Sequence, residues 1–406
     1  MENRYDKYKD SGIAWIGEIP EHWEVCKLST LFFQHKQKNN NSQESNLLSL
    51  SYGNIKRKDI NTSEGLLPES FDNYNIIDKN DIVFRLTDLQ NDKKSLRSAL
   101  CKERGIITSA YVTIRKRGNI NSSYFNYLFR VYDECKVFYG MGDGVRQGVN
   151  FDDLRKLDVL LPQQIQQQSI ATYLDQKCGE IDELITLQEE MITKLQSYKQ
   201  SVITEAVTKG LDKNVPLKDS GIEWIGEFPE HWKVVKIKYL AKIKSGDSIS
   251  SNEIIQEGIY EVYGGNGLMG YCNKKNVNGF NIIIGRVGAL CGNVRLISES
   301  KYITDNALIL NCFDNALYPY MYIMLKAANL NNLNTSNAQP LITGSKVLNV
   351  SLPIPPLSEQ QSITDYLDRK CSEIDELISI KQQKIEKLKD YKKSLIFECV
   401  TGKRKV

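Results

Sequence analysis

One glycine-rich segment of this 406-residue sequence comes close to a known catalytic signature. Residues 265–270 read GNGLMG and so match the GxGxxG pattern that binds dinucleotides at a helix N-terminus. Such a site also needs a helix directly afterwards and an acidic residue about 20 positions on. Here YCNKKNVNGF follows, which has no helical period, and no Asp or Glu occurs before Glu299. We therefore interpret the segment as a set of turns that lets backbone approach a ligand closely.

Other residue sets that carry catalysis or metal binding are missing from the sequence. Residues 138–142, FYGMG, are similar to the FxGxG loop of adenosylmethionine-dependent methyltransferases, but helix-like YLFRVYDECK stands where a strand should precede it. The chain has no NPPY or DPPY tetrapeptide, no Walker A lysine motif and no paired-acid-plus-lysine nuclease motif. Its nine cysteines include no CxxC pair and it has three histidines. We therefore predict no catalytic residue and no metal site.

The composition favours a cytoplasmic protein without a membrane segment. No apolar run approaches the ~18 residues of a membrane span, and the opening MENRYDKYKD lacks the apolar core of a signal peptide. Scattered cysteines fit reduced, mostly buried thiols.

Basic residues gather in two stretches of the chain. Residues 93–132 contain nine Lys or Arg and one acid, and residues 262–298 contain four Lys or Arg and no acid. By contrast, residues 164–208 carry seven acids and three bases. The two basic stretches favour contact with a polyanion such as DNA. The alternative is that these are solvated loop charges.

Two phrases of the sequence occur twice. Residues 9–25, KDSGIAWIGEIPEHWEV, return at 218–234 as KDSGIEWIGEFPEHWKV, and 3 of the 17 positions differ. Residues 169–188 return at 362–381, a shift of 193, with 13 of 20 positions identical. The stretches between these phrases do not match. The first phrase holds all four tryptophans and two histidines, and we interpret it as a packing cap on each domain. A repeated scaffold with two dissimilar inserts is typical of a protein that holds two different binding domains at a fixed separation.

The second repeated phrase begins a long helix in each copy. Apolar residues step by 3 or 4 through residues 181–206 and again 193 positions later, which places them on one helical face. A helix over 164–207 would be about 65 Å long, so we expect each copy to pair with the other as an antiparallel coiled coil. Two separate helices, each packed on its own domain, are the alternative. The predicted interface consists of Ile181, Leu184, Met191, Leu195, Tyr198, Val202, Ile374, Leu377, Leu388, Tyr391 and Leu395.

The remaining segments predict two α+β domains. Short β-branched runs such as 81–84, 111–114, 281–284, 294–297 and 307–310 predict strands, and 122–135 and 318–328 predict helices. We expect a first domain at 1–160, a helical spacer at 161–211, a second domain at 212–352 and a second spacer at 353–406. The predicted fold is α+β, with two globular domains joined by two long antiparallel helices in a pseudo-two-fold repeat.

The repeated phrases resemble those of the specificity subunits of type I restriction–modification systems. The tail phrase at 353–378 is similar to the family's, as are GDGVRQGVNFDDLRKLDVLLP at 142–162 and the glycine-rich segments at 263–271 and 282–294. The resemblance covers essentially the whole chain. One departure is Leu161-Pro162-Gln163-Gln164 where the second copy has Ile354-Pro355-Pro356-Leu357.

The resemblance implies a non-catalytic reader of double-stranded DNA in a bacterial or archaeal cytoplasm. Each target recognition domain would read one half of a split, asymmetric target, and the paired helices would set the spacing and dock two adenine methyltransferase subunits. Motor-nuclease subunits would join that core. Adenosylmethionine would belong to the methyltransferase partners, and ATP and Mg²⁺ to the motor-nuclease partners.

Arg, Lys, Asn and Gln on loops are the side chains expected to read bases and hold phosphates. The predicted DNA-binding residues are Arg57, Lys93, Arg97, Arg146, Gln147, Asn150, Lys274, Lys275, Arg286, Arg295 and Gln339. For any one of them the alternative is a solvated surface residue. Two other functions stay open at this point, a self-contained DNA methyltransferase or nuclease and a coiled-coil adaptor that binds only protein.

Overall fold

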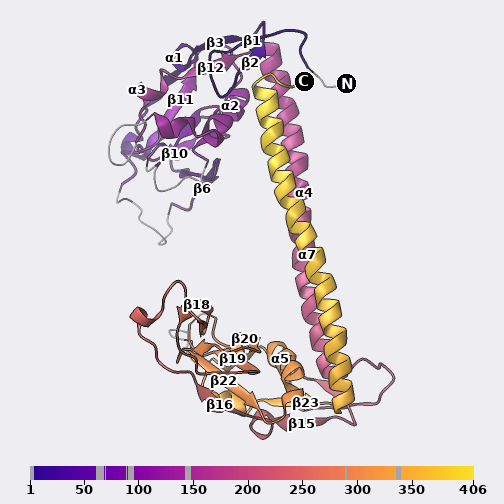
Figure 1. Cartoon of the computed structure of the whole chain (residues 1–406). Helices are drawn as coiled ribbons and strands as arrows, with labels where there is room; N and C mark the ends of the chain where they lie inside the picture. Colours follow the sequence, from indigo (N-terminus) through magenta and orange to yellow (C-terminus); the bar gives the residue numbers. More distant parts are fainter. Residues whose placement is uncertain are drawn as a thin grey trace. The chain divides into compact units, whose positions relative to one another are not determined.

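The chain folds into two compact units that share two long helices (Figure 1). The computed structural model describes residues 4–60, 68, 70–87, 89, 96–141, 148–288, 290–334 and 340–406. Unit 1 consists of residues 1–188 and 383–406, and unit 2 of residues 189–382. Helix α4 (Gln164–Lys209) and helix α7 (Leu357–Val400) each contribute to both units. The predicted α+β class with two long helices is confirmed. The four segments predicted from the sequence are contiguous, whereas unit 1 combines both ends of the chain.

Unit 1 is built around a four-stranded antiparallel sheet covered by one helix. The sheet runs in the order β4 (Phe32–Gln34), β11 (Val112–Lys116), β8 (Ile82–Phe84) and β9 (Ser98–Leu100). Helix α2 (Ser122–Glu134) is capped at its N-terminus by Asn121, whose side chain accepts a hydrogen bond from the Tyr124 N–H. Its aromatic face packs on the sheet, with the Phe84 and Phe129 rings 5.1 Å apart.

The other elements of unit 1 are short. They are β1 (Tyr8–Asp10) with β2 (Glu18–Pro20), β3 (Glu24–Lys27) with β12 (Asp158–Leu161), β5 (Leu48–Ser51) with β6 (Asn54–Arg57), β7 (Asn75–Ile77) with β10 (Gly105–Ile107), α1 (Leu28–Leu31), α3 (Phe151–Leu154), and the 3₁₀ segments η1 (Asn40–Ser42) and η2 (Val137–Gly140).

Unit 2 repeats the central sheet and the helix that covers it. Its sheet runs in the order β16 (Ala241–Ser245), β22 (Ala307–Cys312), β19 (Asn281–Gly285) and β20 (Val294–Ile297), and α5 (Tyr318–Ala327) packs on it. The peripheral strands differ from those of unit 1, because β18 (Gly267–Cys272), β17 (Tyr260–Gly264) and β21 (Tyr302–Ile303) form a three-stranded sheet. The two domains therefore share a central sheet and differ around it.

The remaining elements of unit 2 follow the pattern of unit 1. They are β13 (Leu217–Asp219) with β14 (Glu227–Pro229), β15 (Lys233–Lys236) with β23 (Ser351–Ile354), α6 (Gly344–Leu348), and the 3₁₀ segments η3 (Ile237–Tyr239), η4 (Ser251–Glu253), η5 (Asn315–Leu317) and η6 (Leu330–Leu333).

The repeated WIG-PEHW phrase packs against the start of a long helix in each unit. Trp23 is fully buried in unit 1 and Trp232 is 2% exposed in unit 2. The ring nitrogen Nε2 of His22 lies 3.1 Å from Gln166 Oε1. In unit 2 the corresponding distance, from His231 Nε2 to Glu359 Oε1, is 2.8 Å. Each histidine therefore ties the phrase to a long helix by a hydrogen bond.

The domain of each unit is anchored to a long helix by one buried tyrosine. In unit 1 the Tyr124 hydroxyl donates to the carbonyl oxygen of Val400, at 3.0 Å, near the end of α7. In unit 2 the Tyr320 hydroxyl donates to the carbonyl oxygens of Val207 in α4, at 3.4 Å, and of Pro353, at 3.1 Å. Val207 and Val400 are related by the repeat shift of 193. The same contact therefore joins both domains to the helices.

The long helices bury one heptad seam. Buried or half-buried residues recur with steps of 4 and 3, as in an antiparallel or parallel coiled coil, and every residue between them is exposed. The seam positions on α4 are Ile181, Ile185, Gln188, Ile192, Leu195, Lys199 and Val202. Those on α7 are Ile374, Ile378, Lys381, Ile385, Leu388, Lys392 and Leu395. Both sets are related by the shift of 193.

An ion pair in each unit shows that the two helices run antiparallel. In unit 1 Lys392 Nζ lies 2.6 Å from Asp182 Oδ1, and in unit 2 Lys199 Nζ lies 2.6 Å from Asp375 Oδ2. The start of α4 therefore meets the end of α7 in unit 1, and the reverse holds in unit 2. Lys199 and Lys392 occupy seam positions, where their stems are half-buried and their ammonium groups reach a carboxylate.

Five of the eleven residues predicted to line the helix interface lie outside this seam. Leu184, Met191, Tyr198, Leu377 and Tyr391 are 38–56% exposed. They belong to a second stripe with the same heptad spacing, displaced around the helix. The sequence pattern merged the two stripes because both are apolar, and because polar Gln188, Lys199, Lys381 and Lys392 occupy the seam.

Candidate nucleic-acid interface

The predicted DNA-binding residues divide into those that the structure describes and those outside it. Lys93, Arg146, Gln147 and Gln339 lie outside the described residues. The seven described residues are Arg57, Arg97, Asn150, Lys274, Lys275, Arg286 and Arg295. Their role in binding DNA stays a prediction, and their contacts within the chain are as follows.

Arg57 lies at the end of the β5–β6 hairpin and is held by one acid. Its Nε donates to both carboxylate oxygens of Glu103, at 2.8 and 3.0 Å, and Nη2 also contacts that carboxylate. This bidentate hydrogen bonding lowers the pKa of Glu103 and raises that of Arg57. Because both side chains are exposed, the guanidinium can exchange this carboxylate for a phosphate at small cost.

Arg97 and Asn150 have structural partners in unit 1. Arg97 is fully buried, its Nη1 donates to the Thr87 carbonyl oxygen at 3.3 Å, and its guanidinium lies 5.9 Å from the centre of the Tyr139 ring. Direct contact with DNA would require that it leave this place. The Asn150 side chain caps helix α3 by accepting the N–H groups of Asp152 and Asp153.

The glycine-rich segment of unit 2 forms the β17–β18 hairpin. Arg295 Nη2 donates to the carbonyl oxygen of Asn266, at 2.9 Å, at the tip of this hairpin. A Cβ atom on Gly265 would lie 2.7 Å from the carbonyl oxygen of Asn306, and one on Gly285 would lie 2.7 Å from that of Gly265. The glycines therefore allow backbone to approach backbone within the domain. The close approach that the sequence assigned to a ligand is made by the chain itself.

Two lysines at the other end of this hairpin have polar partners. Lys274 Nζ lies 2.6 Å from Glu253 Oε1, and this hydrogen bond is the main cause that lowers the pKa of Glu253 to about 2. Lys275 Nζ donates to the Ser300 hydroxyl at 3.1 Å. Both lysine side chains also lie over tyrosine rings. A ligand at this surface would have to compete with these contacts.

A cavity of about 570 Å³ in unit 2 is lined by Arg286 and by residues that the sequence analysis did not select. Its lining contains the cations Lys238, Lys244 and Arg286, polar side chains including Thr343 and Asn349, and no acidic residue. Arg286 Nη1 is 3.4 Å from the Ser245 hydroxyl, a weak contact that leaves the guanidinium able to bind an anion. Basic and amide side chains in one hollow are a set that can hold phosphates and base edges.

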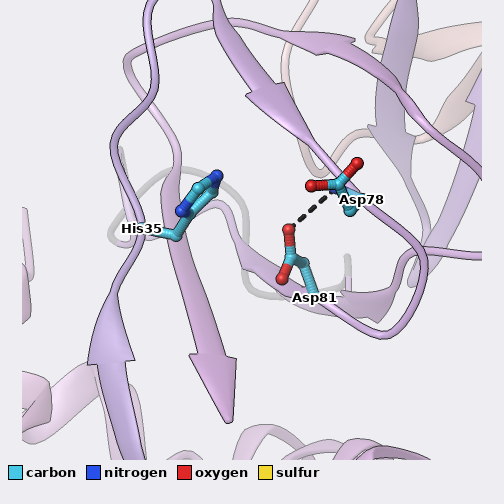
Figure 2. Close-up of side chains that lie close together, drawn as sticks. All are labelled: His35, Asp78 and Asp81. Carbon is cyan, nitrogen blue, oxygen red and sulfur yellow. Dashed lines mark hydrogen bonds between the residues drawn. The ribbon is translucent and has the colours of Figure 1, made fainter.

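One group of potential metal ligands comes together among the described residues, and it lies in unit 1. Figure 2 shows His35, Asp78 and Asp81, whose ligand atoms lie within 4.8 Å of one another. The Asp78 N–H donates to Asp81 Oδ2 at 2.8 Å. Arg115 Nε is 2.7 Å from Asp81 Oδ1, and its Nη2 is 2.7 Å from Asp78 Oδ2. The carboxylates are therefore already neutralised by a guanidinium.

The electrostatics of this group oppose metal binding. Arg104 Nη1 lies 2.8 Å from Asp78 Oδ1 and adds a second guanidinium. Burial acts to raise the pKa of Asp78, but Arg115 and Arg104 lower it below its usual value. Two fixed positive charges beside two carboxylates would repel a cation. Asp78, Asp81, Arg115 and Arg104 therefore form an ion-pair network that fixes the turn between β7 and β8.

Comparison with known proteins relates the chain to one family. Residues 229–390 match the family model described as type I restriction modification DNA specificity domain. The type I restriction enzyme MjaVIII specificity subunit of Methanocaldococcus jannaschii is 24% identical over 359 residues, which are 82% of this chain and 80% of that protein. The chain is therefore similar to type I restriction–modification specificity subunits over most of its length.

Two further specificity-subunit comparisons agree with this assignment. The EcoprrI specificity subunit of Escherichia coli is 34% identical over 134 residues, so the match spans 32% of this chain and about a third of that protein. One solved structure concerns complex assembly and conformational transition of the type I R-M system. A chain in it has a TM-score of 0.72 at 16% identity, covering 94% of this chain and 98% of that one, and shows the same fold.

Among the described residues, no helix is long and apolar enough to span a membrane. Sequence reasoning selected Arg286 but not Lys238 or Lys244, which lie with it at the unit 2 cavity. These lysines precede the acid-free stretch and are 48 and 42 positions from Arg286 in sequence. The alternation of exposed lysines in β16, at Lys242 and Lys244, is a signal that could have found Lys244. Lys238 lies before this strand, in η3.

Proposed function

We propose that this chain is the non-catalytic DNA reader of a type I restriction–modification complex, in which each unit reads one half of a bipartite, asymmetric target. The observation that carries the proposal is that the two units repeat one frame and differ in what surrounds it. Each has the four-stranded sheet, the repeated hairpin and the tyrosine anchor. Unit 1 adds two two-stranded sheets, whereas unit 2 adds one three-stranded sheet. Two unlike peripheries can read two unlike half-sites.

The long helices would set the spacing of the half-sites. Their seam continues without interruption from Ile181 to Val202 on α4 and from Ile374 to Leu395 on α7. A seam with a strict heptad resists bending because each side chain packs between residues of the facing helix. Spacing between half-sites is a geometric property of two-headed DNA readers, and the helices supply a fixed element of this kind.

The second heptad stripe would dock the two adenine methyltransferase subunits. Its exposed apolar residues are Leu184, Leu187, Met191, Tyr198, Leu377, Ile380 and Tyr391, which are 38–56% exposed. Apolar side chains at positions three and four apart are what a partner helix recognises. Because the stripe occurs once on each long helix, the repeat offers two related docking surfaces. Adenosylmethionine would be bound by these partners, and ATP and Mg²⁺ by motor-nuclease subunits that join them.

A domain exchange tests the reading of half-sites. Residues 26–156 are replaced by the corresponding segment of another specificity subunit that keeps a tyrosine at the position of Tyr124, so that the anchor to Val400 remains. The methylated sequence is then read by methylome sequencing of cells that also express the methyltransferase. We expect one half-site to change and the other to stay as it was. A change in both halves would contradict independent reading.

A heptad insertion tests the spacing role. Seven residues are added after Met191 in α4 and seven after the repeat-equivalent Lys384 in α7. Both ion pairs, Asp182–Lys392 and Lys199–Asp375, then remain on their own sides of the insertions. Seven helical residues add about 10.5 Å, which is roughly 3 base pairs of DNA at 34–36 Å per turn. The half-sites should move apart by that amount without changing sequence. Unaltered spacing would refute the spacing role.

The two competing functions predict different results in simple assays. A self-contained methyltransferase would transfer label from adenosylmethionine to unmethylated DNA without partners. A purely protein-binding adaptor would give no sequence-selective gel shift, at stated salt, in the assembled complex. The proposed reader gives no transfer alone and a selective shift in the complex.

A further inference from the structure

The two halves of the repeat differ in charge at the end of the second long helix. Residues 381–406 contain nine Lys or Arg and three acids, whereas the repeat-equivalent residues 188–213 contain four of each. Lys389 and Lys393 both correspond to glutamines, Gln196 and Gln200, in the first copy. The seam residues and the tyrosine anchors are equivalent in the two copies. The packing of the helices therefore does not require the difference in charge.

These lysines line a cavity between the helices and the recognition domain of unit 1. Its volume is about 810 Å³, and five cations line it, namely Arg130, Lys136, Lys389, Lys392 and Lys393. Three acids also line it. Asp182 is paired with Lys392 at 2.6 Å, and Glu134 lies 3.9 Å from Arg130. The third, Asp133, accepts a hydrogen bond from the Arg97 backbone N–H. Five cations against three carboxylates leave the cavity with a positive excess. Lys389 Nζ also lies 2.9 Å from the Glu386 carboxylate, an exposed pair that solvent weakens, and Lys389 and Lys393 are both exposed.

An exposed aromatic residue lies at the same cavity. Tyr52 forms the turn of the β5–β6 hairpin, has a left-handed backbone with φ of 47°, and is 72% exposed. The hairpin also carries Arg57, so the cavity is continuous with a predicted DNA-binding element. Lysine ammonium groups and tyrosine hydroxyls are donors that hold DNA phosphates and carry no sequence information.

We propose that Lys389 and Lys393, with Tyr52 beside them, bind the phosphate backbone of DNA, which gives unit 1 a sequence-independent contact that unit 2 lacks at the equivalent positions. This inference rests on the proposed function, because the cavity would receive the DNA that unit 1 reads. The contact comes from a long helix and adds to those of the recognition domain. It holds the duplex on the unit 1 side whatever bases occupy the target.

The test measures the salt dependence of binding to a random-sequence duplex, by fluorescence anisotropy of the labelled DNA. The full-length chain is compared with the double variant K389Q/K393Q and with K7Q/K9Q. Lys7 and Lys9 are exposed residues of unit 1 that do not line the cavity, so this control removes the same charge elsewhere. Melting temperatures are recorded for all three chains to show that the fold is retained.

We expect K389Q/K393Q to reduce the slope of log K against log salt by about 1.8, because each phosphate contact contributes about 0.9. The control should keep the slope of the original chain. Equal reductions in both variants, or none in K389Q/K393Q, would overturn the inference. If that variant kept its DNA slope but no longer copurified with the methyltransferase subunit, the lysines would be a protein contact and the inference would be wrong.

The outcome separates this inference from the proposed function. If the original chain, assembled with its methyltransferase partners, showed no selective DNA binding, the reader function itself would fail. If it bound selectively with an unchanged slope in K389Q/K393Q, only the phosphate contact would fail.

Discussion

The two stripes on α7 predict opposite effects for two neighbouring substitutions. Leu395 lies in the seam and is 1% exposed, whereas Tyr391 lies in the second stripe and is 51% exposed. Truncating a buried leucine to alanine removes its contacts and leaves a cavity, which costs about 2–5 kcal/mol. For a unit of this size, each kcal/mol lowers the melting temperature by roughly 2–4 °C. L395A should therefore lower it by roughly 4–20 °C, measured by scanning calorimetry.

The Y391A variant should keep its stability and lose affinity for the methyltransferase subunit. An exposed side chain outside special backbone geometry contributes about ±0.5 kcal/mol to stability, so the melting temperature should stay nearly unchanged. A central aromatic residue of a docking surface contributes about 2 kcal/mol or more to binding. Affinity for the methyltransferase subunit should accordingly fall by roughly 30-fold or more in a titration by calorimetry.

The pair of variants refutes the assignment of the stripes if the effects coincide or exchange. Equal losses of stability in L395A and Y391A would mean that both residues lie in the helix interface. A stable L395A with impaired docking would mean that the seam and the docking stripe are the other way round. Leu195 and Leu388 are equivalent in the repeat, and both are half-buried seam residues. L195A therefore serves as a seam control, with a smaller expected loss of stability than L395A.

Two further predictions concern charges buried in unit 1. R115M should lower the free energy of unfolding by about 3–5 kcal/mol at neutral pH, because it leaves the buried Asp81 carboxylate without its guanidinium. Urea denaturation measures this loss of stability. Recovery of stability on adding a divalent cation would contradict the ion-pair interpretation. D133N should flatten the pH dependence of stability. The folded-state pKa of Asp133, raised by burial to about 6 from 3.8, means that the folded chain holds this proton more tightly and loses stability as pH rises between those values. The original chain should lose about 2.5 kcal/mol more than D133N between pH 4 and pH 7. Parallel pH profiles would count against a buried, proton-binding Asp133.

The architecture of the chain could be predicted from its sequence because two of its phrases each occur twice. Two copies of a phrase with the same apolar steps must form the same local structure, and a long uninterrupted helix needs a partner. The strands that were predicted from short β-branched runs, such as β8, β19 and β22, are buried on the central sheets. Their pairing order could not be read, because it depends on contacts between residues far apart in sequence.

The helix interface shows where pattern reasoning ends. Both heptad stripes are apolar, so the sequence alone does not tell which of them meets the partner helix. Gln188 and Lys199 are polar residues of the true seam, so they interrupt its apolar pattern and the two stripes were merged. Lys199 is tolerated there because its ammonium reaches Asp375, a contact that spacing along one helix does not reveal.

The candidate DNA-binding residues show a similar limit. Glu103 is 46 positions from Arg57 and Glu253 is 21 positions from Lys274, so charge counts along the chain missed these ion pairs. The same counts overlooked Lys389 and Lys393, because they are on a helix that was assigned to spacing and docking. Only the fold brings the end of α7 beside the globular domain of unit 1.

The return of the chain's end to unit 1 has a consequence for how the protein is made. Unit 2 consists of one continuous segment, whereas unit 1 lacks Leu395, Val400 and the rest of its share of helix α7 until unit 2 has been translated. Domains usually mature on the ribosome in the order in which they are encoded. Here the first domain to emerge is completed only after the second, because Tyr124 has no Val400 carbonyl to bind until helix α7 has been made.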